Sequence, residues 1–325
     1  MIDTYLDSSF VRMTKRSSES EDVNFIFIQS PNHSKLNHFL FMIRKISFLL
    51  VFFAMAGCAP KTYLRRTSRA IFQYLPAQKP LISAHRGGGD YAGYPENCIE
   101  SFAWLAKQMP VIIECDVTLT KDSVPVMLHD ETLERTTTGT GRVGEVSWEY
   151  CQGLRLKDNK GTLTAFKMPT LAQVLAWGRD KVIFTIDVKR SVPFEKVTEL
   201  VKRYRAHNYA SIITYNAQDA AKVHRLDPEI MISVTIRNQN EYQRHHDLGI
   251  ADQRMIAFVG TREPNAELCD FLHQKGIRCI LGTLGNLDKM AEARGDQVYQ
   301  EFVKKGADIL STDRPLAAHK AINFE

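Results

Sequence analysis

Short apolar runs alternate with amphipathic helical stretches from Leu81 onward, and this alternation restricts the fold more than any other feature. Such runs, separated by helices of about 10–15 residues, are typical of parallel βα units. The apolar runs lie at 81–84, 111–117, 125–128, 181–188, 211–215, 230–236, 255–259, 278–283 and 308–312. The helical stretches lie at 97–108, 170–178, 194–206, 217–226, 240–248, 265–275 and 295–305. The pattern predicts an α/β fold, a TIM-like (β/α)8 barrel.

One of the nine runs is too many for an eight-stranded barrel. The run at 125–128 follows the run at 111–117 after only residues 118–124, which include the turn-like sequence Lys121-Asp122-Ser123. A parallel crossover needs about a dozen residues or more. We therefore expect 125–128 to return as the second strand of a hairpin and the other eight runs to form the barrel.

Residues 131–180 form a long connection that is rich in threonine and glycine. A single helical pattern is visible in it, near its end. Long connections in compact domains usually form a lid or a small subdomain. The sequence therefore predicts a small inserted segment on the barrel.

Residues 42–61 have the order of a bacterial lipoprotein signal. Arg44 and Lys45 give a positive start, an apolar stretch too short to span a bilayer follows, and the sequence Ala-Gly-Cys ends at Cys58. We expect a signal peptide at 42–57 and lipid attachment at Cys58; the alternative is a buried hydrophobic helix. Signals of this kind begin at the first methionine, so we expect residues 1–41 to be a misassigned leader that precedes the true start, Met42.

A basic segment, residues 58–80, separates this signal from the first apolar run, and two prolines interrupt it. We expect a tether that rests on anionic lipid headgroups or is simply a solvated linker. The barrel domain is then expected at 81–325. The expected location is the cell envelope, at the outer membrane or its periplasmic face, with a lipid anchor as the membrane contact.

Composition excludes some partners and leaves others open. The formal net charge is only +5, and no basic stripe with interleaved aromatic residues is present, so we expect no nucleic-acid partner. Five cysteines follow Cys58 without a CxxC pair, which indicates core residues rather than a disulfide framework. The sequence does not define an oligomeric state.

Functional side chains gather at the ends of apolar runs. His85 and His129 each follow such a run, and Glu114 and Asp116 lie two residues apart in another, so their side chains share one face of the strand. Asp187 adds a third carboxylate in a later run. Converging carboxylates repel each other unless a cation lies between them, and ligation by oxygen alone favours a hard divalent metal, Mg²⁺ or Ca²⁺.

Two cationic side chains accompany these carboxylates. Arg86 follows His85, and Lys189 lies two residues after Asp187. Both residue types bind phosphate, arginine as a fork and lysine as a point charge. A divalent cation with such side chains stabilises the charge of phosphoryl transfer, and two histidines can carry the proton transfers. Taken singly, each feature is also compatible with a structural role, for example a surface ion pair.

The order and spacing of these residues resemble the glycerophosphodiester phosphodiesterase family from Leu81 to about Pro315. The shared motifs are His85-Arg86-Gly87, Pro95-Glu96-Asn97, Glu114-Cys115-Asp116, His129-Asp130, Leu133-Glu134-Arg135-Thr136-Thr137, Pro169-Thr170-Leu171, Asp187-Val188-Lys189 and Thr312-Asp313-Arg314-Pro315. The resemblance implies metal-dependent hydrolysis of glycerophosphodiesters to glycerol 3-phosphate and an alcohol, either directly or through a cyclic phosphate formed by the neighbouring glycerol hydroxyl.

The resemblance also implies a role for each site residue. His85 and His129 are the expected acid/base pair, and Glu114, Asp116 and Asp187 are the expected metal ligands. Substrate binding is expected from Arg86 and Lys189, with Glu96 and Asn97 lining the same pocket. Two other functions stay open: a phospholipase-like activity on intact lipids, and a binding lipoprotein that has lost turnover.

Two departures from the family pattern stand out. Asp187 replaces the usual glutamate and is shorter by one methylene, which puts the third metal ligand in question. The usual Trp-Thr-Val-Asn at the seventh strand is replaced by residues 280–285, so the aromatic residue that packs on glycerol is missing there. Tyr215 and Trp148 are the candidates to supply an aromatic side chain instead.

Overall fold

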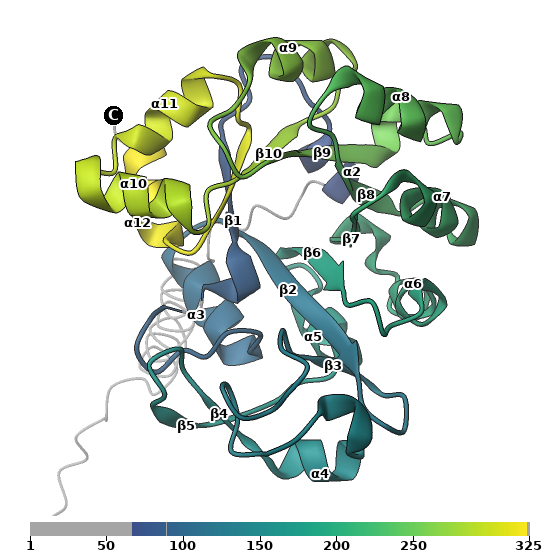
Figure 1. Cartoon of the computed structure of the whole chain (residues 1–325), viewed down its shortest axis with the longest axis vertical. Coiled ribbons are helices and arrows are strands. Elements are labelled where there is room, and N and C mark those ends of the chain that lie inside the picture. Colours follow the sequence, from purple (N-terminus) through teal and green to yellow (C-terminus); the bar gives the residue numbers. More distant parts are fainter. Residues whose placement is uncertain (1–66, 89, 324–325) are drawn as a thin grey trace, which may run out of the picture. The chain divides into compact units, whose positions relative to one another are not determined.

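The structure is a computed structural model that describes residues 67–88 and 90–323 (Figure 1). Eight parallel strands form a closed barrel in the order β1-β2-β6-β7-β8-β9-β10-β11, and β11 pairs again with β1. The strands are β1 (Leu81–Ala84), β2 (Ile112–Leu119), β6 (Ile183–Val188), β7 (Ala210–Thr214), β8 (Met231–Thr235), β9 (Met255–Gly260), β10 (Cys279–Gly282) and β11 (Ile309–Thr312). The predicted (β/α)8 barrel is confirmed.

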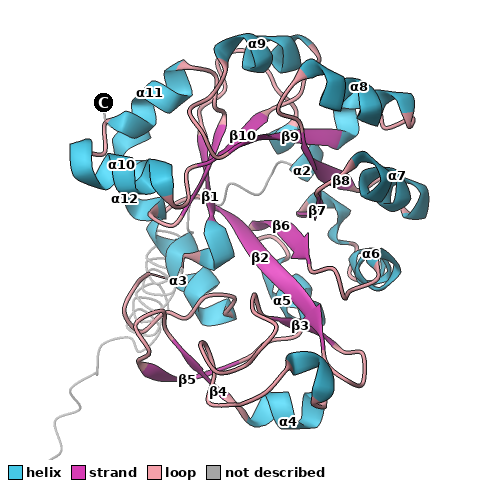
Figure 2. Ribbon diagram, in the orientation of Figure 1, coloured by secondary structure: helices cyan, strands magenta, loops and turns pink. Residues whose placement is uncertain are grey.

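Helices surround the strands on the outside (Figure 2). They are α3 (Ile99–Gln108), α5 (Leu171–Gly178), α6 (Phe194–Arg203), α7 (Ala217–Leu226), α8 (Gln239–Asp247), α9 (Ala266–Gln274), α10 (Asn286–Arg294), α11 (Val298–Lys304) and α12 (Pro315–Ile322). Sequence patterning missed α10 and α12. In α10 the buried residues are only Leu287, Asp288 and Ala291, too few to form an evident apolar stripe.

The short strand β3 (Pro125–Met127) pairs antiparallel with β2, as the hairpin argument predicted. Ser123 takes a positive φ of 63° in the turn that joins them. The Leu128 amide then donates to the Asp116 carbonyl at 3.1 Å. His129 therefore reaches the barrel mouth beside the strand that carries Glu114 and Asp116.

The inserted segment contains η3 (Val143–Glu145), α4 (Trp148–Gly153) and an antiparallel pair, β4 (Arg155–Lys157) and β5 (Leu163–Lys167). It has its own apolar cluster, in which Leu133, Cys151 and Leu156 are buried. This confirms the predicted small insertion. The five cysteines among the described residues are free, and all are buried.

The expectation of a tether at 58–80 is wrong for its described part. Helix α2 (Ser68–Phe72) packs against the barrel, and the Phe72 side chain is completely buried. The Arg278 guanidinium donates to the carbonyls of Ile71 at 2.9 Å and Lys79 at 3.0 Å. Burial of apolar surface outweighs the basic character of this segment. The expected signal peptide, Cys58 and residues 1–41 lie outside the described residues. Among those described, no helix is both long and apolar enough to cross a membrane.

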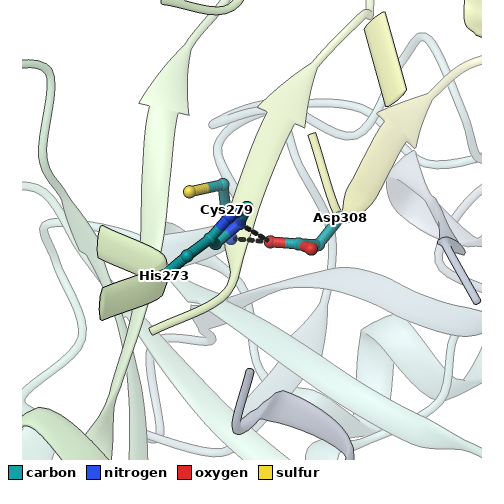
Figure 3. A group of neighbouring side chains, drawn as sticks. All are labelled: His273, Cys279 and Asp308. Carbon is teal, nitrogen blue, oxygen red and sulfur yellow. Dashed lines mark hydrogen bonds and ion pairs between the residues drawn. The ribbon is translucent and has the colours of Figure 1, made fainter. Parts of the chain in front are cut away.

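A polar cluster of His273, Cys279 and Asp308 lies where β10 and β11 begin, away from the ends that carry the predicted site (Figure 3). One oxygen of Asp308 accepts from the His273 ring nitrogen at 2.8 Å and from the Cys279 backbone amide at 2.7 Å. Tyr74 stacks on His273 with ring centroids 3.8 Å apart. The Asp308 carboxylate therefore accepts hydrogen bonds from both other members of the cluster, and these bonds connect α9 to β10 and β11.

We expect Asp308→Ala to lower the free energy of unfolding by about 2–4 kcal/mol, because two hydrogen bonds to a carboxylate are lost and a buried amide is left unpaired. Urea denaturation measures this change. Asp270→Ala is the control, since Asp270 is an exposed aspartate of α9, the helix that carries His273. Equal free energies of unfolding for the two variants would show that the cluster does not stabilise the fold.

Candidate active site

Six of the predicted site residues meet at one end of the barrel. They line a cavity of about 230 Å³ and are His85, Glu114, Asp116, His129, Asp187 and Lys189. Because the carboxyl ends of parallel strands lie at the same end of a barrel, residues far apart in sequence converge there. This is the end at which barrel enzymes build their active sites.

Three buried carboxylates form an acidic trio, Glu114, Asp116 and Asp187, whose ligand oxygens lie within 4.8 Å of one another. Asp116 and Asp187 are register partners on the paired strands β2 and β6, which explains their proximity. The shorter side chain of Asp187 therefore still reaches the trio. Burial and the neighbouring charge of Asp116 raise the pKa of Glu114 to about 8.

Lys189 is the cation placed among these carboxylates. Its ammonium lies 2.6 Å from Asp116 Oδ1 and 2.7 Å from Asp187 Oδ2. Burial opposes ionisation of Asp116, but the charge of Lys189 outweighs it and lowers the pKa of this carboxyl. One lysine offsets one of three negative charges. The oxygen-only donor set and its excess charge fit a hard divalent cation.

Two residues with positive φ form hydrogen bonds that fix two carboxylates of the trio. Asn97 (φ 56°) donates its side-chain amide to Asp116 Oδ2 at 2.8 Å and accepts from the Asp116 amide at 2.8 Å. Arg86 (φ 54°) donates its backbone amide to Glu114 Oε2 at 2.7 Å. A Cβ at Gly87 would lie 2.1 Å from a ring carbon of Phe102, so the glycine of this motif is sterically required.

The structure therefore corrects part of the predicted substrate pocket. Glu96 and Asn97 are almost completely buried, at 3% exposure each, and neither lines the cavity. The Arg86 guanidinium lies 3.2 Å from Glu96 through Nη1, and its buried Nε lies 4.0 Å from Asp116 without a hydrogen-bond partner among the described residues. Glu96 and Asn97 thus bind other site residues, Lys189 faces the cavity, and phosphate binding by Arg86 stays a prediction.

His85 is backed by Asp313, a residue to which sequence reasoning assigned no role. Ala84 and Thr312 are register partners on β1 and β11, so the residues that follow them lie side by side. His85 Nδ1 is 2.6 Å from Asp313 Oδ1, which leaves Nε2 available to the cavity. Burial opposes protonation of His85, but the Asp313 hydrogen bond and the charge of Glu114 outweigh it and raise the imidazole pKa.

His129 is backed in the same way by Asp130, with Nδ1 2.7 Å from Asp130 Oδ1. Arg135 donates to both oxygens of Asp130, at 2.5 and 2.9 Å, and also to Glu96. Glu96 in turn binds Arg86. A continuous polar network thus connects the two histidine-bearing segments. Hydrogen bonding to Arg135 lowers the pKa of Asp130, so this carboxyl stays charged.

Tyr215 supplies an aromatic side chain at the mouth, one of the two candidates named from the sequence. Its hydroxyl donates to Asp187 Oδ1 at 2.9 Å, and it lines the cavity together with Phe258 and Leu284. Burial and the charge of Asp187 raise the pKa of the Tyr215 phenol, so it remains a neutral donor. The other candidate, Trp148, packs against the cluster of the inserted segment and does not line the cavity.

We expect Asp313→Asn to shift the part of the pH–rate profile that depends on His85 toward lower pH. Loss of the negative charge removes stabilisation of the imidazolium, so the pKa of His85 falls. We also expect kcat to fall about 10- to 100-fold, because the ring loses its orienting partner. Asp296→Asn, which alters an ion pair with Arg314, is the control. An unchanged profile would remove Asp313 from the site.

The fold and mouth are together those of a barrel hydrolase that acts on phosphate esters. The model of the glycerophosphoryl diester phosphodiesterase family matches residues 85–316. Since this match covers more than half of the chain, the chain belongs to that family.

Relatives and solved structures agree with this assignment. A glycerophosphodiester phosphodiesterase of Caldanaerobacter subterraneus is 28% identical over 73% of this chain and 95% of its own length. Human glycerophosphodiester phosphodiesterase 1 is 30% identical, but the match spans 52% of this chain and only 53% of the human protein. The crystal structure of a glycerophosphoryl diester phosphodiesterase from Parabacteroides distasonis has a TM-score of 0.74 at 36% identity, and the match covers 78% of this chain and 90% of that one.

Proposed function

We propose that the chain hydrolyses glycerophosphodiesters to glycerol 3-phosphate and an alcohol, with two histidines as acid and base and a divalent metal as cofactor. The observation that carries this proposal is the convergence in one cavity of two histidines, each paired with a carboxylate, around a buried acidic trio. An acid and a base are what phosphodiester hydrolysis requires, because the nucleophile loses a proton and the departing oxygen gains one.

Each residue has a defined task in this proposal. One histidine takes a proton from the attacking water as the water oxygen bonds to phosphorus. The other donates a proton to the alcohol oxygen as the ester bond breaks, so that glycerol 3-phosphate and the free alcohol are released. Lys189 offers its positive charge to the phosphate oxygens. Asp313 and Asp130 hold the imidazole rings through Nδ1, so that the second nitrogen of each ring can serve the reaction.

The acidic trio would hold the metal, Mg²⁺ or Ca²⁺. When bound, such an ion neutralises the phosphate and the charge that develops in the transition state. Asn97 and the Arg86 amide keep two of the three carboxylates in place by hydrogen bonds. The elevated pKa of Glu114 agrees with this assignment, because burial and the charge of Asp116 both disfavour its ionisation, and a bound cation would favour it.

A panel of substrates tests the proposal. The purified protein is incubated with glycerophosphocholine, glycerophosphoethanolamine and intact phosphatidylcholine, each with Mg²⁺, Ca²⁺ or EDTA. Release of glycerol 3-phosphate that EDTA abolishes supports the proposal. Diacylglycerol or phosphatidate as the main product would instead indicate a phospholipase-like enzyme. Tight ligand binding without turnover would indicate a binding protein.

We further propose that Cys58 carries a lipid and anchors the protein in the cell envelope. The lipoprotein-like order of residues 42–58 supports this. We expect Cys58→Ser to move the protein from the membrane fraction to the soluble fraction of an expressing bacterium, with unchanged turnover per molecule. Fractionation and immunoblotting measure the shift. Detection of peptides from residues 1–41 by mass spectrometry would contradict Met42 as the true start.

A further inference from the structure

A second hollow opens beside the active-site cavity, and its volume is about 670 Å³. Both spaces are lined by Asp187, Lys189 and Tyr215, so they share a border at the acidic trio. The hollow lies between the segment that joins β6 to α6 and the start of α7, and these two helices lie side by side (Figure 1). A diester whose phosphate lies at the trio can therefore extend directly into this hollow.

Most charged groups that line the hollow already have a partner of opposite charge. Lys189 binds Asp116 and Asp187, and Lys222 binds Glu195 at 3.0 Å. Lys222 is therefore paired within the hollow, and Lys189 lies at the acidic trio, where the phosphate is proposed to bind. The remaining charged residues of the lining are a cation, Arg190, and an anion, Asp219.

Arg190 and Asp219 are the unpaired charges of the hollow. Arg190 is exposed and forms no ion pair with any described residue. The Asp219 carboxylate accepts one hydrogen bond from the Asn216 side chain, and its backbone amide donates one to the same residue. No described cation lies within ion-pair distance of Asp219. The two side chains are also not paired with each other, so the hollow presents one positive and one negative charge at separate points.

This arrangement matches a ligand that carries both charges. A guanidinium binds a carboxylate through two parallel hydrogen bonds, and a carboxylate binds an ammonium group. We propose that the hollow holds the alcohol part of the substrate and selects zwitterionic alcohols of the amino-acid type, with Arg190 on the carboxylate and Asp219 on the ammonium group. This inference rests on the proposed function and adds the substrate class.

Three diesters that differ only in the alcohol test the proposal on the full-length protein. They are glycerophosphoserine, which has both charges, glycerophosphoethanolamine, which has only the ammonium group, and glycerophosphoglycerol, whose alcohol is uncharged. For the unmodified protein we expect kcat/KM to be highest with glycerophosphoserine. Each charged contact at such a partly exposed site is expected to contribute about tenfold.

Two substitutions separate the two contacts. Arg190→Gln should lower kcat/KM about tenfold for glycerophosphoserine alone, because only this alcohol has a carboxylate. Asp219→Asn should lower it about tenfold for glycerophosphoserine and glycerophosphoethanolamine, while asparagine can keep the hydrogen bonds of the α7 start. Neither should affect glycerophosphoglycerol. Arg203→Gln, which alters the Glu199 ion pair on α6, is the control and should affect none of the three.

The outcomes also distinguish this inference from the proposed function. If the two variants hydrolyse all three diesters with unchanged kcat/KM, or with kcat/KM lowered equally for all three, the hollow does not select the alcohol. The proposed function would then remain intact. If none of the three diesters is hydrolysed by the unmodified protein, the proposed function itself fails.

Discussion

Replacing His85 or His129 by alanine is expected to lower kcat by about 10²–10⁴-fold while the barrel stays folded, because each ring carries a proton transfer that water performs poorly. Both rings line the cavity, and each is oriented by its own carboxylate, Asp313 or Asp130. Hydrolysis rates of the purified variants measure the loss, and circular dichroism checks the fold.

His246→Ala serves as the control, because His246 is an exposed histidine of α8 that does not line the cavity. This variant should keep full activity. Near-normal turnover in His85→Ala or His129→Ala would remove that histidine from the mechanism. The double variant should be little slower than the slower single variant if both act in one step.

Removal of divalent metal is expected to abolish turnover and to lower the melting temperature. A cation that binds the native trio and not the unfolded chain stabilises the fold by mass action. Addition of Mg²⁺ or Ca²⁺ should restore both properties. Because Glu114 has a pKa of about 8 without metal and must lose its proton to bind one, metal affinity should increase as the pH rises toward 8.

Glu114→Gln provides the matched test of the metal site. Glutamine keeps the size of the side chain but removes one charged ligand, so the rise in melting temperature on metal addition should shrink or disappear. Asp270→Asn, at an exposed position of α9, should retain the full rise. A metal-dependent rise of equal size in Glu114→Gln would place the cation elsewhere.

The barrel could be predicted because its strands are continuous apolar runs, and β1 and β3 begin where the sequence placed them. The antiparallel path of β3 followed from the length of one connection alone. In contrast, α10 was missed because its surface is mostly polar, and α2 was taken for a tether because its basic neighbours obscured Ile71 and Phe72. Burial of a short apolar pair depends on a surface that local sequence does not reveal.

The cluster of site residues was also predictable, since strand-end histidines and carboxylates converge at a barrel mouth. Their support was less visible. Asp313 is 228 positions from His85, and only the register of β1 with β11 brings them together. The opposite error concerned Glu96 and Asn97, which belong to a family motif but face inward. A motif identifies a residue as part of the site without showing whether it contacts a ligand or another side chain.

The most direct test of the central claim is ³¹P NMR of glycerophosphoethanolamine incubated with the purified protein and Mg²⁺ or Ca²⁺. The diester signal should be replaced by that of glycerol 3-phosphate, with ethanolamine released, and EDTA or His85→Ala should prevent the change. An unchanged diester, or the appearance of phosphoethanolamine with free glycerol, would contradict the proposed reaction.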